Sequence, residues 1–350
     1  VTDISEIGSP VAIGTVNSEG TSSARPRADH VHAHGAQTNT TLHATATSSG
    51  AGFMSSGHVK KLTGIHKDVV VDYGADPTGT IDSTTAVQNA VNDVTAAGGV
   101  IYFTPGTYLV GSITCTGGAG VKIYGSTRYS TTLICTTTTA DWFTFNSSGL
   151  IEFSNFEIRL ITLATVKTAG AYFVLNSCHT SVFENLRISA PFKGFEVINC
   201  GGLYFKTIKF LPGATASTWH STFFLQTVGG IFFHGVDVNM GSNVTVSEGL
   251  VVLDTGCDTV YFTDCGFNQI GAALGASTGG HCILLTHSLS PSSFAPRWIK
   301  FTQVAVEASG GSGWRIEDCN NVELHNCYAV TSNIGIQVLG GSNLKVIGGV

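Results

Sequence analysis

The stretch Val182-Phe-Glu-Asn-Leu-Arg-Ile188 contains the pattern that decides the fold. Apolar and polar residues alternate around Phe183, which predicts a short β-strand with one buried face. The same pattern recurs along the chain, so that one apolar residue of each copy aligns with Phe183. The aligned column is Ile101, Ile123, Phe153, Phe183, Phe205, Phe233, Phe262, Phe301, Leu324 and Val346, with successive separations of 22, 30, 30, 22, 28, 29, 39, 23 and 22 residues. Near-regular spacing with variable insertions predicts a solenoid.

Two further positions repeat at fixed offsets from this column. Four cysteines lie five residues before a column residue, namely Cys178, Cys200, Cys257 and Cys319. Apolar pairs end eight residues before it, for example Phe195/Val197, Phe223/Leu225, Trp314/Ile316 and Ile336/Val338. Each coil therefore contributes two or three short strands, and stacked coils align like residues into internal ladders. Because no CxxC motif occurs, we expect the nine cysteines to be small buried hydrophobes, not a disulfide framework or metal ligands.

The composition agrees with a fibre or a solenoid. Charged residues make up 11% of the chain, against roughly 25% in an ordinary soluble domain, and 43 residues are glycine. The net charge is −6 and no Lys/Arg cluster occurs, so nucleic acid is not an expected partner. The sequence has no run of 18 apolar residues and no basic start followed by an apolar stretch. We therefore expect neither membrane insertion nor a signal peptide.

Three segments precede the first coils: Val69 to Gly79, Asp82 to Val94, and Gly98 to Tyr108. Together they resemble the opening of the pectate-lyase-like β-helix superfamily, which is widespread in phage tailspikes and polysaccharide-degrading enzymes. The resemblance implies an all-β fold, a right-handed parallel β-helix. An apolar stripe, Ala86, Val87, Ala90, Val91 and Val94, predicts one short helix that covers the open end of the first coil, with Ser83 as its N-cap.

These observations predict three regions, which are residues 1–68, 69–100 and 101–350. Residues 69–100 form the entry strand and the capping helix, and residues 101–350 form the coils. We expect the coils to continue beyond residue 350, because the sequence ends directly after a column position with no capping segment. The separation of 39 residues between Phe262 and Phe301 predicts a lateral loop within the solenoid.

Residues 1–68 lack sustained periodicity and are rich in Gly, Ser, Thr and Ala. The segment Ala28-Asp-His-Val-His-Ala-His-Gly35 and the elements after it resemble the connecting region of phage tail fibres. This resemblance implies an extended fibrous region in which three chains run side by side as a homotrimer, assembled with other phage tail or baseplate proteins. The expected location is the virion tail, which is assembled in the host cytoplasm and acts outside the cell.

His30, His32 and His34 alternate with Val31 and Ala33, so that a strand would place all three imidazoles on one face. One reading is a surface histidine run with no ligand role. In a parallel trimer, however, three copies of two histidines supply six nitrogens, the number that an octahedral transition metal requires. The resemblance to phage fibres with HxH segments implies such a clamp. We predict a structural ion held by His32 and His34, with His30 as the alternate: iron, or else zinc or nickel.

Two classes of function compete. The first is an attachment fibre that binds a host-surface glycan without chemistry, and the second is a depolymerase, either a glycosidase or a polysaccharide lyase. A glycosidase needs two carboxylates about 5 to 9.5 Å apart. The acidic candidates are Asp237, Asp264 and Glu307, which lie four, two and six residues after their column phenylalanines. Because these offsets differ, solvated outward positions are the simpler interpretation.

A lyase needs a proton-abstracting base and a positive group that stabilises the enolate. Lys206, Lys209, His234 and His325 are scattered candidates. We therefore expect binding rather than catalysis. Trp219 and Trp298 flank long inserts and are candidates for stacking on sugar rings, although burial is the commoner role of tryptophan.

Overall fold

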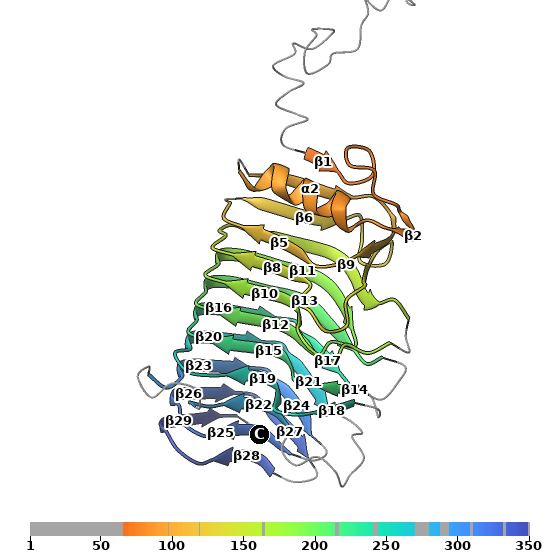
Figure 1. Cartoon of the computed structure of the whole chain (residues 1–350). Coiled ribbons are helices and arrows are strands. Elements are labelled where there is room, and N and C mark those ends of the chain that lie inside the picture. The colour runs from red at the N-terminus through yellow and green to blue at the C-terminus, as the bar shows by residue number, and fades with distance from the viewer. Residues whose placement is uncertain are drawn as a thin grey trace, which may run out of the picture. The chain divides into compact units, whose positions relative to one another are not determined.

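The computed structural model describes residues 66–350, except residues 97, 119, 163–164, 214–216, 241–243, 270–279, 288–293, 309–310, 332–333 and 349–350. Its strands stack in three ladders, and every pair of neighbouring strands is parallel (Figure 1). The all-β prediction of a parallel β-helix is therefore confirmed. None of the helices in this part of the chain is long and apolar enough to cross a membrane. The predicted fibrous region, residues 1–65 in particular, lies outside the described residues.

The first ladder carries the predicted column. Its strands are β1 (His66–Asp68), β3 (Gly99–Phe103), β6 (Val121–Gly125), β9 (Glu152–Leu160), β11 (His179–Ser189), β13 (Gly201–Leu211), β16 (Gly229–His234), β20 (Asp258–Thr263), β23 (Arg297–Thr302), β26 (Asn320–His325) and β29 (Ser342–Ile347). Strand β1 ends just before residue 69, where the sequence predicted the entry region to begin.

The second ladder continues from the first around a bend, because β9, β11 and β13 run through both. Its own strands are β2 (Thr78–Asp82), β4 (Gly106–Val110), β7 (Thr131–Cys135), β17 (Asp237–Asn239), β21 (Gly266–Gln269), β24 (Ala305–Ala308) and β27 (Tyr328–Thr331).

The third ladder forms a separate sheet. Its strands are β5 (Ile113–Thr116), β8 (Phe143–Asn146), β10 (Ala171–Asn176), β12 (Lys193–Ile198), β15 (Ser221–Gln226), β19 (Gly249–Leu253), β22 (His281–Leu285), β25 (Ser312–Ile316) and β28 (Ile334–Val338). A small parallel pair, β14 (Ser217–Trp219) and β18 (Val244–Val246), lies in the connections that lead into this ladder.

The column predicted from the sequence is an uninterrupted register row. Each column residue is the strand partner of the next, from Ile101 paired with Ile123 to Leu324 paired with Val346. The insertion before Phe301 does not break the row, because Phe262 pairs with Phe301. Nine of the ten side chains are at most 1% exposed. Val346 is 43% exposed, since no described strand stacks beyond β29.

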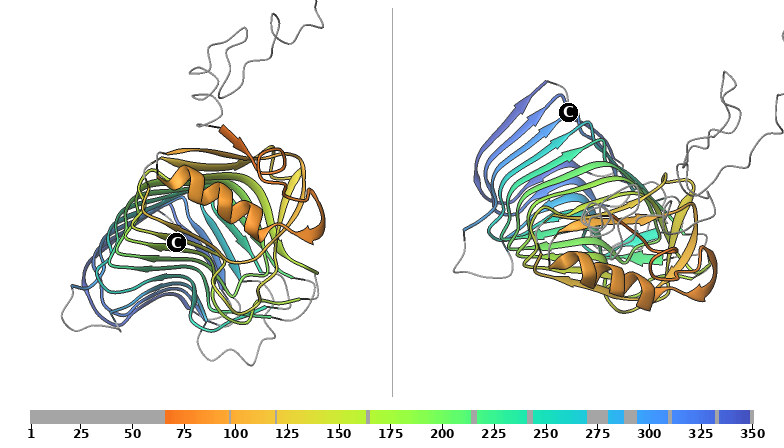
Figure 2. Two further views of the ribbon diagram at one scale, coloured as in Figure 1. Left: turned by 45° about the horizontal axis from the view of Figure 1, so that its top comes forward. Right: turned by 90° about the horizontal axis from the view of Figure 1, so that it is seen from above.

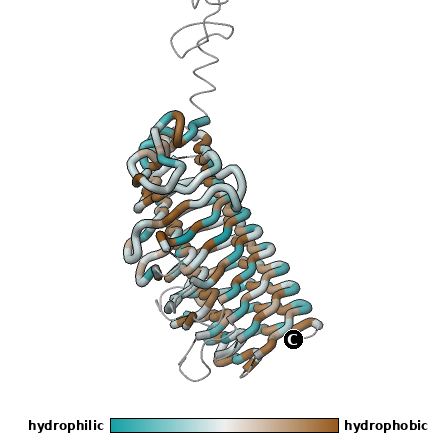
Figure 3. Tube along the Cα trace, turned by 90° about the vertical axis from the view of Figure 1, so that its right-hand side faces the viewer, coloured by the Kyte–Doolittle hydropathy of each residue, from teal (hydrophilic) through white to brown (hydrophobic). Residues whose placement is uncertain are grey.

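Stacked rings form much of the core. Phe205 lies between Phe183 and Phe233, with ring centroids 5.6 and 4.9 Å away. Hydrophobic and hydrophilic stretches alternate and recur from coil to coil along the stack (Figure 3). All nine cysteines are buried and unbridged, as predicted. Burial raises the pKa of the Cys282 thiol to about 12, so this thiol stays protonated and unreactive.

From the coil of Phe153 onward, the bend between the first and second ladders is made by one left-handed residue per coil, two positions after the column. These residues are Asn155, Asn185, Thr207, Gly235, Asp264, Gln303, Asn326 and Gly348. Asparagine, aspartate and glycine tolerate positive φ better than most residues. The Asn185 amide also donates to Asn155 Oδ1 at 2.7 Å, which ties two neighbouring coils together.

The single described helix, α2 (Thr84–Thr95), covers the open end of the first coils (Figure 2). It buries Val87, Ala90, Val91 and Val94, so the predicted apolar stripe is confirmed. Ser83 occupies the N-cap position, but the prediction that its side chain caps the helix is wrong. Its hydroxyl accepts the Asp76 N–H at 2.9 Å instead, because the preceding turn folds back onto it.

The lateral loop predicted between Phe262 and Phe301 falls largely on residues 270–279 and 288–293, outside the described residues. Between these two segments, β22 (His281–Leu285) keeps the third ladder continuous by pairing with β19 and β25.

Candidate functional site

A row of aromatic rings runs along the outside of the first ladder. Tyr204, Phe232 and Tyr261 each precede a column phenylalanine by one residue and are register partners on β13, β16 and β20. Because successive strand residues point to opposite faces, these rings lie outside while the column lies inside. The rings of Tyr204 and Phe232 are nearly parallel, with centroids 4.9 Å apart, and the Tyr261 centroid lies 5.5 Å from that of Phe232. We call these three residues the outer aromatic stack.

A groove of about 580 Å³ begins at the end of this stack and crosses β20, β23, β26 and β29. We call it the first-ladder groove. Its lining is Tyr261, Trp298, Ile299, Lys300, Asn321, Glu323, Asn343, Leu344 and Lys345. Trp298 adopts a φ of 56° at the corner before the column, and its side chain is left 56% exposed. The groove therefore combines flat apolar surface with several polar groups.

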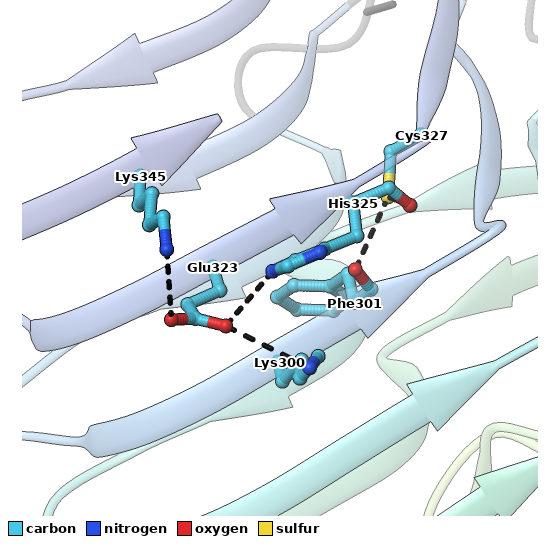
Figure 4. A network of polar contacts seen from close by, with 6 residues as sticks. All are labelled: Lys300, Phe301, Glu323, His325, Cys327 and Lys345. Carbon is cyan, nitrogen blue, oxygen red and sulfur yellow. Dashed lines mark hydrogen bonds and ion pairs between the residues drawn. The ribbon is translucent and has the colours of Figure 1, made fainter. Parts of the chain in front are cut away.

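The charges in the groove centre on Glu323 (Figure 4). His325 Nε2 donates to its carboxylate at 2.8 Å, while Lys300 Nζ and Lys345 Nζ lie 3.7 and 3.9 Å from it. The hydrogen bond from His325 lowers the pKa of Glu323, and the two lysines add to this effect. Two ammonium groups around one carboxylate leave the groove with a net positive charge when His325 is neutral.

The three acidic candidates do not converge on one site. Asp264 occupies the left-handed bend, a backbone position that accounts for an aspartate, and its Oδ2 lies 3.7 Å from His234 Nδ1. Asp237 and Glu307 instead line a common hollow on the second ladder. Asp237 forms an ion pair with Lys209 at 3.0 Å. The structure thus brings together two of the three candidates and separates Asp264 from them.

The basic candidates are paired with different partners. Lys206 Nζ lies 5.5 Å above the Tyr204 ring, Lys209 contacts Asp237, and His325 contacts Glu323. Lys206 and His234 are register partners on neighbouring strands, so that they and Asp264 follow one edge of the first ladder. The His234 side chain is 62% exposed, however, and this edge lacks the water exclusion that favours proton transfer in an active site.

The two tryptophan candidates differ in exposure. Trp298 is exposed in the groove, as stacking on a ligand requires. Trp219 is fully buried in β14, and its Nε1 donates to Ser217 Oγ at 3.2 Å, so of the two roles considered for it burial holds and stacking on sugars does not. The physical reason is that β14 pairs with β18 and directs Trp219 to its buried face, while the neighbouring Thr218 faces outward.

The predicted metal ligands His30, His32 and His34 lie outside the described residues. Within residues 66–350, leaving aside the gaps, no group of three or more His, Cys, Asp or Glu side chains is placed to hold an ion.

The outer aromatic stack was not among the residues predicted from the sequence. The signal was present, because the residue before the column reads Tyr204, Phe232 and Tyr261 in three successive coils. The repeat was aligned on the inward-facing residues of each strand, whereas the outward-facing residues between them carry the surface chemistry.

Comparisons with known proteins agree with this architecture. The family model for rhamnogalacturonase A/epimerase, pectate-lyase-like, matches residues 69–331. The chain belongs to this pectate-lyase-like family. A search of curated proteins found no match.

Among solved structures, the chain is similar to the tailspike protein gp49 of Acinetobacter baumannii bacteriophage Fri1, a capsular polysaccharide depolymerase. The TM-score is 0.56 at 13% identity, with 82% of this chain and 59% of that chain covered. ORF18 of Geobacillus virus E2 matches with a TM-score of 0.49 at 15% identity, with coverage of 83% and 63%. The alginate lyase from Paenibacillus sp. str. FPU-7 has a TM-score of 0.49 at 10% identity, with coverage of 75% and 96%.

At these identities the likeness is one of fold. The pectate-lyase-like chain spans about three fifths of the length of the two viral proteins that it matches.

Proposed function

We propose that this pectate-lyase-like chain is part of a phage tail fibre or tailspike that binds a glycan on the host surface. The ligand would occupy the first-ladder groove and extend along the outer aromatic stack. The observation that carries the proposal is the outer aromatic stack, which leads from Tyr204 to Tyr261 and into a groove that also holds the exposed Trp298, on a face whose outward positions are ordinarily polar.

The groove has the features that a glycan needs. Aromatic side chains offer a flat apolar surface to one face of a sugar ring, and their polar edges remain wet. Lys300, Glu323 and Lys345 supply charged donors and acceptors beside that surface. Rigid strands carry all of these side chains, so that little conformational entropy is lost on binding. The fold shared with the Fri1 tailspike supports the assignment to a phage tail.

Binding to host capsule or cell-wall glycan tests this function. The complete protein should bind the purified polysaccharide, and Trp298→Ala should weaken binding at least tenfold, which is a loss of about 1.4 kcal/mol. Tyr129→Ala is the matched control, because Tyr129 is 71% exposed but lies outside the groove. Equal affinities of the two variants would place the glycan elsewhere.

A second candidate function is depolymerisation of the same glycan. The observation that favours it is the shared hollow of Asp237 and Glu307, since a pair of carboxylates is what a glycosidase uses. Incubation with the glycan should release no new reducing ends or unsaturated products if the protein only binds. Steady product release that is abolished by Asp237→Asn or Glu307→Gln would establish the enzyme instead.

The finer features of this proposal concern assembly. We propose a homotrimer whose N-terminal chains run side by side and are clamped by a transition metal on His32 and His34. The assembled protein would form part of the virion tail together with other tail or baseplate proteins. The observation behind the clamp is the alternation of the three histidines in residues 30–34.

A further inference from the structure

The second ladder carries a hollow of about 140 Å³ on its outer surface. It shares no lining residue with the first-ladder groove. The residues that shape it are Asp237, Gly266, Asn268, Ala305, Glu307 and Tyr328. We call it the second-ladder hollow.

The hollow arises from one register row. Asp237, Gly266, Ala305 and Tyr328 are successive strand partners on β17, β21, β24 and β27. Two small residues therefore lie between two larger ones, which leaves a slot with Asp237 at one end and Tyr328 at the other. Neighbouring strands are about 4.8 Å apart, so the slot spans about 14 Å between the end residues.

Gly266 keeps this slot open, although the backbone does not require a glycine there. Its φ lies outside the left-handed region. A Cβ at this position would meet only Asp237 Oδ1, at 3.6 Å, which is an ordinary contact. Gly266 is the first residue of β21 and pairs with both neighbouring strands. Glycine weakens such a paired strand, and it often marks the close approach of a ligand or another backbone. A bound ligand is thus a physical reason for the missing side chain.

The lining determines which ligand fits. Asp237 directs Oδ2 to Lys209 and Oδ1 toward the slot. Glu307 lies in the adjacent row, in register with Asn268. Carboxylate and amide oxygens accept hydrogen bonds from hydroxyl groups. Tyr328 is 56% exposed and forms an aromatic wall at the far end.

We propose that the second-ladder hollow is a second carbohydrate subsite, which takes one neutral, hydroxyl-rich sugar ring. Its hydroxyls donate to Asp237 and Glu307, and its apolar face packs against Tyr328. The two carboxylates disfavour an anionic sugar, because like charges repel in the partly desolvated slot. The proposal rests on the glycan-binding function proposed above, but it concerns separate residues and a separate ligand.

Saturation-transfer NMR of the complete protein with methyl β-D-glucoside and methyl β-D-galactoside tests the subsite, with D-glucuronate as the acidic comparison. Glucuronate is expected only in the positively charged first-ladder groove, where Gly266→Val should not affect it, whereas at least one neutral glycoside should bind in the slot. Gly266→Val should fill the slot and weaken this binding at least tenfold. The melting temperature should be unchanged or higher, because valine favours strands more than glycine does.

The matched control is Gly229→Val, since a Cβ at Gly229 would meet nothing closer than 3.8 Å and the residue lies outside the hollow. It should bind the glycosides as the unmodified protein does. Tyr328→Ala, which truncates an exposed side chain, gives a second test should Gly266→Val fail to fold. It should also lose binding.

Failure of this subsite is distinguishable from failure of the first-ladder groove. Trp298→Ala should lose polysaccharide binding and keep the signal of the neutral glycoside. The subsite is overturned if the unmodified protein binds neither glycoside, if Gly266→Val weakens the binding of glucuronate as much as that of the glycoside, or if Gly266→Val and Tyr328→Ala leave glycoside binding unchanged. Any of these results is compatible with glycan binding in the first-ladder groove.

Discussion

At the scale of single residues, Tyr204 and Phe205 are neighbours in sequence that lie on opposite faces of β13. Phe205 is fully buried between two stacked rings, whereas Tyr204 is 37% exposed. Truncating a buried phenylalanine removes its transfer free energy and leaves a cavity, so Phe205→Ala should lower the free energy of unfolding by about 3–5 kcal/mol. Tyr204→Ala should cost about 1 kcal/mol or less, since it loses only surface packing.

Chemical denaturation of both variants measures this difference. Tyr204→Ala should at the same time weaken glycan binding, and Phe205→Ala should affect binding only through unfolding. A similar loss of stability in the two variants would contradict the assignment of inner and outer faces.

At the scale of elements, the junction of β22 and β25 contains a buried histidine. The Ser312 N–H donates to His281 Nδ1 at 3.1 Å, so this nitrogen carries no proton. Burial, assisted by the charge of Arg315, lowers the pKa of His281 to about 4. Protonation would place a charge in the sheet and break the hydrogen bond to Ser312.

This arrangement predicts a loss of stability in acid. Between pH 6.5 and 4 the unfolded chain binds a proton at His281 that the folded chain does not, so stability falls as the pH is lowered through this range. The loss approaches about 2–3 kcal/mol at pH 4, since one pKa unit corresponds to about 1.4 kcal/mol. Melting temperatures of His281→Gln should depend less on pH in this window. His234→Gln, which replaces an exposed histidine, should behave as the unmodified protein does.

At the scale of the whole molecule, the proposed trimer clamp makes a prediction about metal. Purified complete protein should contain about one transition metal ion per three chains, because two histidines from each chain supply six nitrogens. The double variant His32→Ala/His34→Ala should contain none. Ligation requires neutral imidazole, so acidification below the ordinary histidine pKa of about 6.5 should release the ion.

Elemental analysis before and after chelation, together with the mass of the assembly, provides the measurement. His43→Ala is the matched control, because His43 lies outside the alternating segment. A trimer that contains no metal would refute the clamp and leave the β-helix and its groove unaffected.

The amino-acid sequence by itself determined the coil register. All nine pairings of the column, from Ile101 to Val346, were readable, because side chains alternate with a period of two and each coil must bury its inner face. The capping helix was predictable from the sequence for a related reason, since its apolar residues recur with the period of an α-helix. The N-cap role of Ser83 was not, because the turn from Asp76 that occupies its hydroxyl brings together residues seven positions apart.

The tertiary structure alone decided the site. Asp237 and Glu307 are 70 residues apart in sequence, and they share a hollow only because two coils with small residues, Gly266 and Ala305, lie at the right level. Trp219 and Trp298 both flank long inserts, yet one packs inside β14 and the other points outward from a left-handed corner. Alternation predicts which face of a strand a side chain occupies. The constant offset of four residues from the column also places Asp237, Gly266, Ala305 and Tyr328 in one row. Whether a hollow forms along that row depends on how the side chains of adjacent rows pack, and the repeat does not encode that.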